Sequence, residues 1–100
     1  QNMTVSVGKD LSESVGASMS VTIGKDLSET IGSNHTEKVA KDFSLAAKKV
    51  QITATDEVTI QAGKAKIQLK KNGDITISGK KINIKGSGDV IVKGRKVIAN

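Results

Sequence analysis

The chain sets a β-branched residue before a glycine every eight residues: Val7-Gly8, Val15-Gly16, Ile23-Gly24 and Ile31-Gly32. The next octad keeps the spacing but replaces the glycine, at Val39-Ala40. A fixed short period is typical of solenoids and fibres in which each repeat is one strand and one turn. The octads therefore favour an architectural role over that of a globular enzyme.

Apolar residues alternate with polar ones within the octads and in the residues that follow them, which predicts strands with one buried face. In the first half they occupy odd positions: Met3, Val5, Val7, Leu11, Val15, Met19, Val21, Ile23, Leu27 and Ile31. After Phe43 and Leu45 the phase slips by one residue, and pairs follow at Val50/Ile52, Val58/Ile60, Ile67/Leu69, Ile75/Ile77, Ile82/Ile84, Val90/Val92 and Val97/Ala99. Because a one-residue shift turns every side chain to the other face, each slip must fall in a turn.

Composition limits how much of a core one chain can build. Of 100 residues, 36% are hydrophobic and 1% aromatic, Phe43 being the single aromatic residue, and there is no cysteine or proline. One small domain of this kind is marginal by itself. We therefore expect other chains, or long one-dimensional stacking, to complete its burial.

Charge is distributed unevenly along the chain. Residues 1–50 hold six lysines and six acids, whereas residues 51–100 hold nine lysines and one arginine against four acids. Such an excess can attract an acidic partner. We interpret it instead as solubilising lysines on solvent-facing strand positions and in turns, where they also block edge pairing.

Two segments allow a second interpretation. Residues 35–50 could form a helix, since Val39 and Phe43 lie at helical spacing after a possible cap at Ser33 or Asn34. The same residues keep the odd-position phase, so we expect strand. Asn72-Gly73 could form a tight hairpin, but the repeat on both sides predicts a corner between successive strands.

The octads, the Ile-x-Ile steps of residues 73–79 and 80–86, the missing aromatics and the basic second half resemble a known family. It is the C-terminal needle of valine–glycine repeat protein G (VgrG), the spike of bacterial type VI secretion. The needle of the tailed-phage central spike is similar. The resemblance covers the whole chain, with Val-Gly octads over residues 1–47 and Ile-x-Ile repeats over 48–100. It implies one needle domain, the C-terminal fragment of a longer spike protein.

The resemblance implies an all-β fold in which three identical chains intertwine as a triple-stranded β-helix, or triangular β-prism, each chain moving from one face to the next. It places in the shared core Val7, Val15, Ile23, Ile31, Val39, Ile52, Ile60, Ile67, Ile77, Ile84 and Val92. Gly8, Gly16, Gly24 and Gly32 would lie at the corners. Ala40 departs from the motif.

The function implied is a membrane-piercing needle that is assembled in the bacterial cytoplasm and exported. The implied partners are two further copies, a tip protein or effector at the C-terminal end, the secretion tube through an upstream base, and transiently the target membrane. Neither nucleic acid nor a cofactor is expected. The alternative is a binding module on the cell surface, either a β-solenoid or a trimeric adhesin stalk.

Residues that could carry chemistry are few. His35 lies on an odd position, so three copies could meet near the three-fold axis and bind a metal. This signal is weak, because no further ligand is evident. We expect a hydrated polar layer with Glu37, which would let His35→Val preserve or raise thermal stability. With one histidine and no cysteine, no nucleophile–base pair can be argued, and we expect no enzyme.

Overall fold

The computed structural model describes residues 2–100 and divides the chain into two units, Gln1–Phe43 and Ser44–Asn100. The protein is all-β, and the described residues contain three strands and no helix. The helical interpretation of residues 35–50 is therefore wrong. Consequently, no helix in residues 2–100 could span a membrane.

The first unit consists of extended segments joined by sharp bends. Two-residue bends occupy positions 8–9, 16–17, 24–25, 32–33 and 40–41, so the bends keep the eight-residue period of the sequence. Each bend starts at a glycine of the repeat, or at Ala40 in the last case. No strand is assigned to residues 2–43, because their backbone groups have no ladder partner within the chain.

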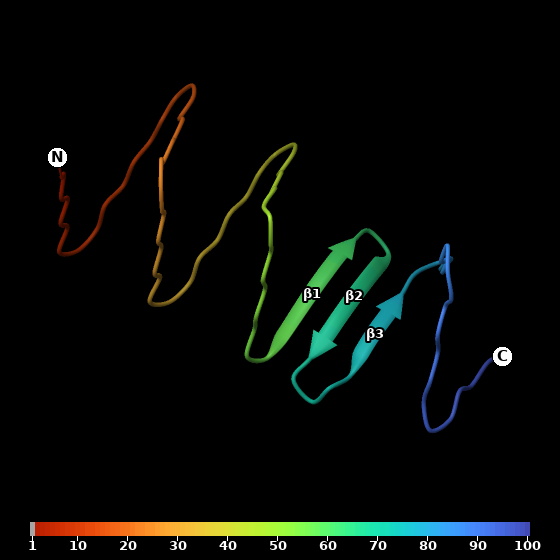
Figure 1. Cartoon of the computed structure of the whole chain (residues 1–100). Coiled ribbons are helices and arrows are strands. Elements are labelled where there is room, and N and C mark those ends of the chain that lie inside the picture. The colour runs from red at the N-terminus through yellow and green to blue at the C-terminus, as the bar shows by residue number, and fades with distance from the viewer. Residues whose placement is uncertain (1) are drawn as a thin grey trace. The chain divides into compact units, whose positions relative to one another are not determined.

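The second unit contains a three-stranded antiparallel sheet, with β1 at Glu57–Ala62, β2 at Ala65–Lys70 and β3 at Ile75–Ser78. The strands lie in sequence order, side by side (Figure 1). In the register, Ile60 pairs with Ile67, which pairs with Ile77. Bends at residues 48 and 55–56 precede the sheet, and bends at 80, 87–88 and 95 follow it.

Glycine makes both hairpins possible. Gly63 has φ +55 at the first of two loop residues, the position at which a type II′ turn needs a positive φ. Gly73 has φ +101 in the loop of residues 71–74, where the Gly73 amide donates to the Lys70 carbonyl at 3.0 Å. The Asp74 amide donates to Oδ1 of Asn72 at 3.0 Å, an Asx turn that fixes the loop.

These hairpins correct one prediction. Asn72-Gly73 does not lie at a corner between separate faces, because β2 and β3 pair with each other on either side of it. Between residues 57 and 78 the chain therefore stays within one sheet, and does not pass to a new face with each strand. Tight loops form here in place of corners because they satisfy backbone donors and acceptors without a second chain.

The single chain has no core. None of residues 2–100 is buried, and the chain exposes 11282 Å². A compact monomer of 10.4 kDa would expose about 5,400 Å², and the fully unfolded chain about 15,000 Å². Alone, the chain thus leaves about twice the surface of a folded globule in contact with water.

Gly73→Ala is expected to destabilise the protein by about 1 kcal/mol or more, because an L side chain at φ +101 is strained. Gly88→Ala is the matched control, since Gly88 has no positive φ and an added Cβ would meet nothing within 4 Å. Urea unfolding of both variants measures the difference. Equal losses at the two positions would contradict the assigned turn.

Candidate assembly interface

One face of the sheet is apolar. Cross-strand partners share a face, so the register assembles two rows, Val58–Leu69–Ile75 and Ile60–Ile67–Ile77. Even on the central strand, Ile67 is 41% and Leu69 39% exposed. The second unit thus forms an apolar face on which none of the described residues is buried.

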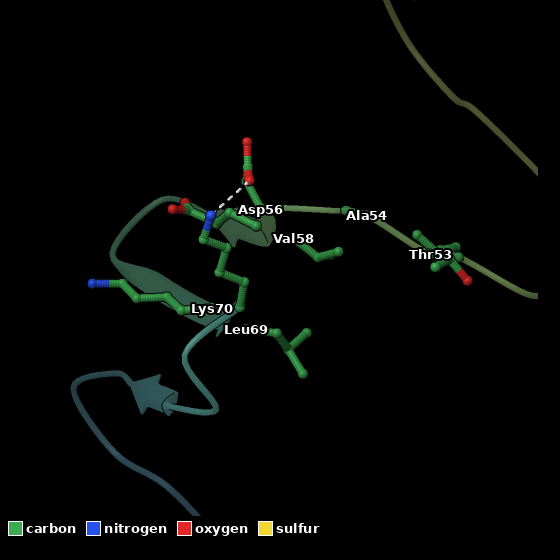
Figure 2. Close-up of a pocket in the computed structure, with 9 residues that line it drawn as sticks. Thr53, Ala54, Asp56, Val58, Leu69 and Lys70 are labelled. Atoms are coloured by element: carbon green, nitrogen blue, oxygen red, sulfur yellow. Dashed lines mark ion pairs between the residues drawn. The ribbon is translucent and has the colours of Figure 1, made fainter.

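A shallow hollow of about 250 Å³ lies where the chain enters the sheet. Figure 2 shows Val58 and Leu69 pointing to the same side of the sheet and Lys70 pointing away from it. Ile52 and Thr53, which precede β1, also line this hollow. The dashed line marks the exposed ion pair between Lys71 Nζ and Asp56 Oδ1, 3.6 Å apart.

The first unit has a comparable apolar row. The five β-branched residues that precede its bends are only 43% to 50% exposed: Val7, Val15, Ile23, Ile31 and Val39. The other large apolar side chains of this unit are 64% exposed or more. Each bend therefore shields the residue before it, but the row as a whole stays open.

The remaining predicted core residues are also exposed in the single chain. Ile60, Ile67 and Ile77 lie on the apolar face of the sheet, and Ile52 lines the hollow beside it. Ile84 and Val92 lie beyond β3 and are 72% and 68% exposed. Their place in a shared core remains a prediction.

The repeat glycines adopt ordinary backbone angles. None of Gly8, Gly16, Gly24 and Gly32 has a positive φ, and a Cβ added at any of them would meet nothing within 4 Å. Within one chain the bends could therefore accept a larger residue. A requirement for glycine at these bends would have to come from another chain that approaches closely.

The opposite face of the sheet is polar and holds a network that alternation alone did not predict. Gln68 Nε2 donates to Oε2 of Glu57 at 2.7 Å, and Thr59 Oγ1 donates to the same oxygen at 2.8 Å. The hydrogen bond from Gln68, followed by that from Thr59, lowers the pKa of Glu57 below its ordinary value of 4.5. Only the hairpin register, which the octads did not reveal, brings Gln68 beside Glu57.

Because the folded pKa of Glu57 is lowered, this network stabilises the sheet above pH 4.5, and its contribution is lost as the pH falls through the lowered pKa. Gln68→Ala should raise the pKa of Glu57 towards 4.5. Gln61→Ala is the control, since Gln61 donates to the Gly63 carbonyl instead. Carboxyl-carbon NMR titration measures the shift, and an unchanged midpoint in Gln68→Ala would rule out the network.

His35 and Glu37 form a polar pair at odd positions of the first unit, between Ile31 and Val39 of its apolar row. His35 Nε2 lies 2.6 Å from Glu37 Oε1, beside a shallow hollow of about 340 Å³ that Val39 and Phe43 complete. The hydrogen bond to Glu37 raises the pKa of His35 above 6.5. Within the single chain, residues 2–100 bring no three of His, Cys, Asp and Glu together as metal ligands, and a role for His35 at a metal stays a prediction.

The pair reverses the expectation that His35→Val preserves or raises thermal stability. If another chain covers this row, removing the histidine alone leaves the Glu37 carboxylate buried without a partner, which is costly. We therefore expect His35→Val to lower the melting temperature in the assembled protein and the double variant His35→Val, Glu37→Val to restore or raise it. Thermal unfolding followed by circular dichroism measures both. Equal melting temperatures for the single and double variants would contradict a covered pair.

No protein-family model matches the chain. A search of curated proteins likewise found no significant match.

Proposed function

We propose that this chain is the needle of a type VI secretion spike, a structural device related to phage tails that pierces membranes as an intertwined homotrimer. The resemblance of its octads and Ile-x-Ile steps to the VgrG needle supports the proposal. One observation carries it: the chain forms ordered apolar rows over most of its length and buries none of them itself. The simplest way to bury these apolar rows is against further copies of the same chain.

Three copies of the sheet can enclose a core. If the apolar faces of three chains turn inward, each sheet of residues 57–78 supplies one wall. An Ile or Val side chain that passes from exposed to fully buried contributes roughly 1.5–3 kcal/mol. Val58, Ile60, Ile67, Leu69, Ile75 and Ile77 would all gain in this way. Association of the three chains is then inseparable from folding.

The first unit supports the same architecture differently. Its extended segments have no ladder partners within the chain, and unpaired strand edges are unfavourable unless another chain covers them. Interwoven neighbours would pair these edges and leave none exposed along the shaft. Threaded chains of this kind unfold slowly, so kinetic stability would resist the load of penetration.

The proposed partners follow from this role. The C-terminal end would carry a tip protein or a secreted effector, and an upstream base would join the needle to the secretion tube. The trimer would be assembled in the bacterial cytoplasm and exported towards the target membrane. We assign it no catalytic residue, cofactor or nucleic acid.

The rival is a binding module, either a single-chain β-solenoid or a trimeric adhesin stalk. A single-chain solenoid stacks its strands so that apolar rows are buried within the chain. Here the rows that precede and follow the sheet remain exposed. This favours completion by other copies over a single-chain solenoid.

Sedimentation equilibrium over a wide dilution range tests the assembly. We expect a stable trimer of three times 10.4 kDa that persists in mild denaturant. A monomer would overturn the spike and favour the single-chain solenoid.

Matched substitutions locate the interface. Ile77→Asp puts a charge on the apolar face and should abolish the trimer, because a buried unpaired carboxylate is costly. Ser78→Asp adds the same charge on the opposite face, across from Lys66, and should leave the trimer intact. Equal effects of both variants would show that the apolar face is not the interface.

The same pair tests the role in secretion. In a bacterium that carries this chain in its spike, we expect Ile77→Asp to abolish contact-dependent killing of neighbouring cells. Ser78→Asp should leave killing at the wild-type level. If the Ile77→Asp strain loses the trimer but kills at the wild-type level, the trimer of this chain is not required for piercing and the proposed function is wrong.

A further inference from the structure

The alternation of apolar and polar residues fails at two places near the C-terminal end. Large apolar residues are adjacent in the chain only at Val90-Ile91-Val92 and Val97-Ile98. Because neighbouring residues of an extended segment point to opposite faces, each run puts apolar side chains on both faces. Whichever face other copies cover, an apolar side chain is left facing outward in each run.

The inward pairs of the earlier repeats indicate which residues these are. Bends at 87–88 and at 95 flank the segment of residues 89–94, and no bend or turn interrupts it. Val90 and Val92 continue the inward pairs of the earlier repeats, which leaves Ile91 outward. Ile91 is 71% exposed, more than Val90 and Val92, and Ile98 is 78% exposed, more than Val97. The two isoleucines lie seven residues apart, one repeat step, and thus occupy equivalent positions.

Cations lie between these isoleucines in the chain. They are Lys93, Arg95 and Lys96, around the bend at residue 95, while Asp89 is the single acid in residues 75–100. The ion pairs among residues 2–100 involve Lys71 and His35, so these residues give the three cations no acidic partner. Residues 91–98, which we term the basic apolar patch, thus combine exposed isoleucines with unpaired positive charge.

This combination selects among acidic partners. Binding to single-stranded nucleic acid uses aromatic stacking, and residues 44–100 contain no aromatic side chain. The phosphate backbone of a nucleic acid provides no apolar contact for two exposed isoleucines. The surface of an anionic bilayer offers both kinds of contact, phosphate groups for Lys and Arg and the acyl boundary for apolar side chains.

We propose that the basic apolar patch of residues 91–98 binds the surface of an anionic lipid membrane. The inference rests on the proposed function, to which it adds the chemistry of the membrane contact. Ile91 and Ile98 enter the boundary between headgroups and acyl chains, while Lys93, Arg95 and Lys96 hold lipid phosphates. A trimer presents three copies, and linked copies bind more tightly than one.

Vesicle co-sedimentation of the full chain tests the proposal. We expect binding to vesicles of equal phosphatidylglycerol and phosphatidylcholine, and none to pure phosphatidylcholine. Binding should weaken as salt rises from 0.1 to 0.5 M, because screening shortens the reach of the charges. Equal binding to the neutral vesicles, or no binding to either, would overturn the proposal.

Two pairs of variants separate the charged and apolar contributions. Lys93→Gln with Lys96→Gln should weaken binding by about tenfold or more, whereas Lys9→Gln with Lys25→Gln removes the same charge from the first unit and should change it less than twofold. Ile91→Ser with Ile98→Ser should also weaken binding by about tenfold. Its control is Thr76→Ser with Asn83→Ser, outward positions of the preceding repeats. Equal effects within either pair would contradict the patch.

Two further measurements distinguish the possible failures. Sedimentation of the same samples reports whether the trimer is present. A trimer that does not bind anionic vesicles overturns this inference alone. A monomer overturns the proposed function. Competition by a DNA duplex tests the rival partner. If the duplex binds as tightly as the vesicles and the isoleucine variant binds both normally, the patch is a general polyanion site and the lipid assignment is wrong.

Discussion

The structure depends on apolar rows that the chain forms but does not cover. Regular alternation places Val, Ile and Leu on one face over most of the sequence, yet the single chain leaves 11282 Å² exposed. Removing apolar surface from water is the dominant favourable contribution to folding, and here one copy cannot obtain it. The strands, bends and hairpins are thus arranged for association, and their stability depends on whatever covers these rows.

The two units meet this constraint in different ways. In the first unit, two-residue bends recur every eight residues and residues 2–43 contain no strand, so their backbone groups and apolar side chains lack partners among the described residues. The sheet of the second unit satisfies its backbone locally through two tight loops at Gly63 and Gly73. It still leaves its apolar face open. The sheet is therefore the part of the chain with most of its hydrogen bonds already made before assembly.

The polar residues divide into groups with different consequences. Glu57, Thr59 and Gln68 satisfy one another on the outward face of the sheet, where burial is not required. His35 and Glu37 lie between Ile31 and Val39 of the apolar row, and their 2.6 Å contact gives the Glu37 carboxylate a partner if that row is covered. The unpaired cations near residue 95 accompany exposed isoleucines instead of acids. The polar groups of the sheet thus lie on the face that we expect to remain in water. The cations near residue 95 are different, because we expect them to contact a lipid membrane.

The sequence alone determined the all-β class, the positions of the bends in the first unit and the apolar face of each strand, because side-chain alternation and local backbone preference are encoded over a few residues. It did not determine which strands pair. The hairpins at Gly63 and Gly73 decided that β1, β2 and β3 share one sheet, and only their register brought Gln68 to Glu57. Pairing depends on contacts between residues distant in the chain, and a repeat offers the same local signal for a corner and for a hairpin.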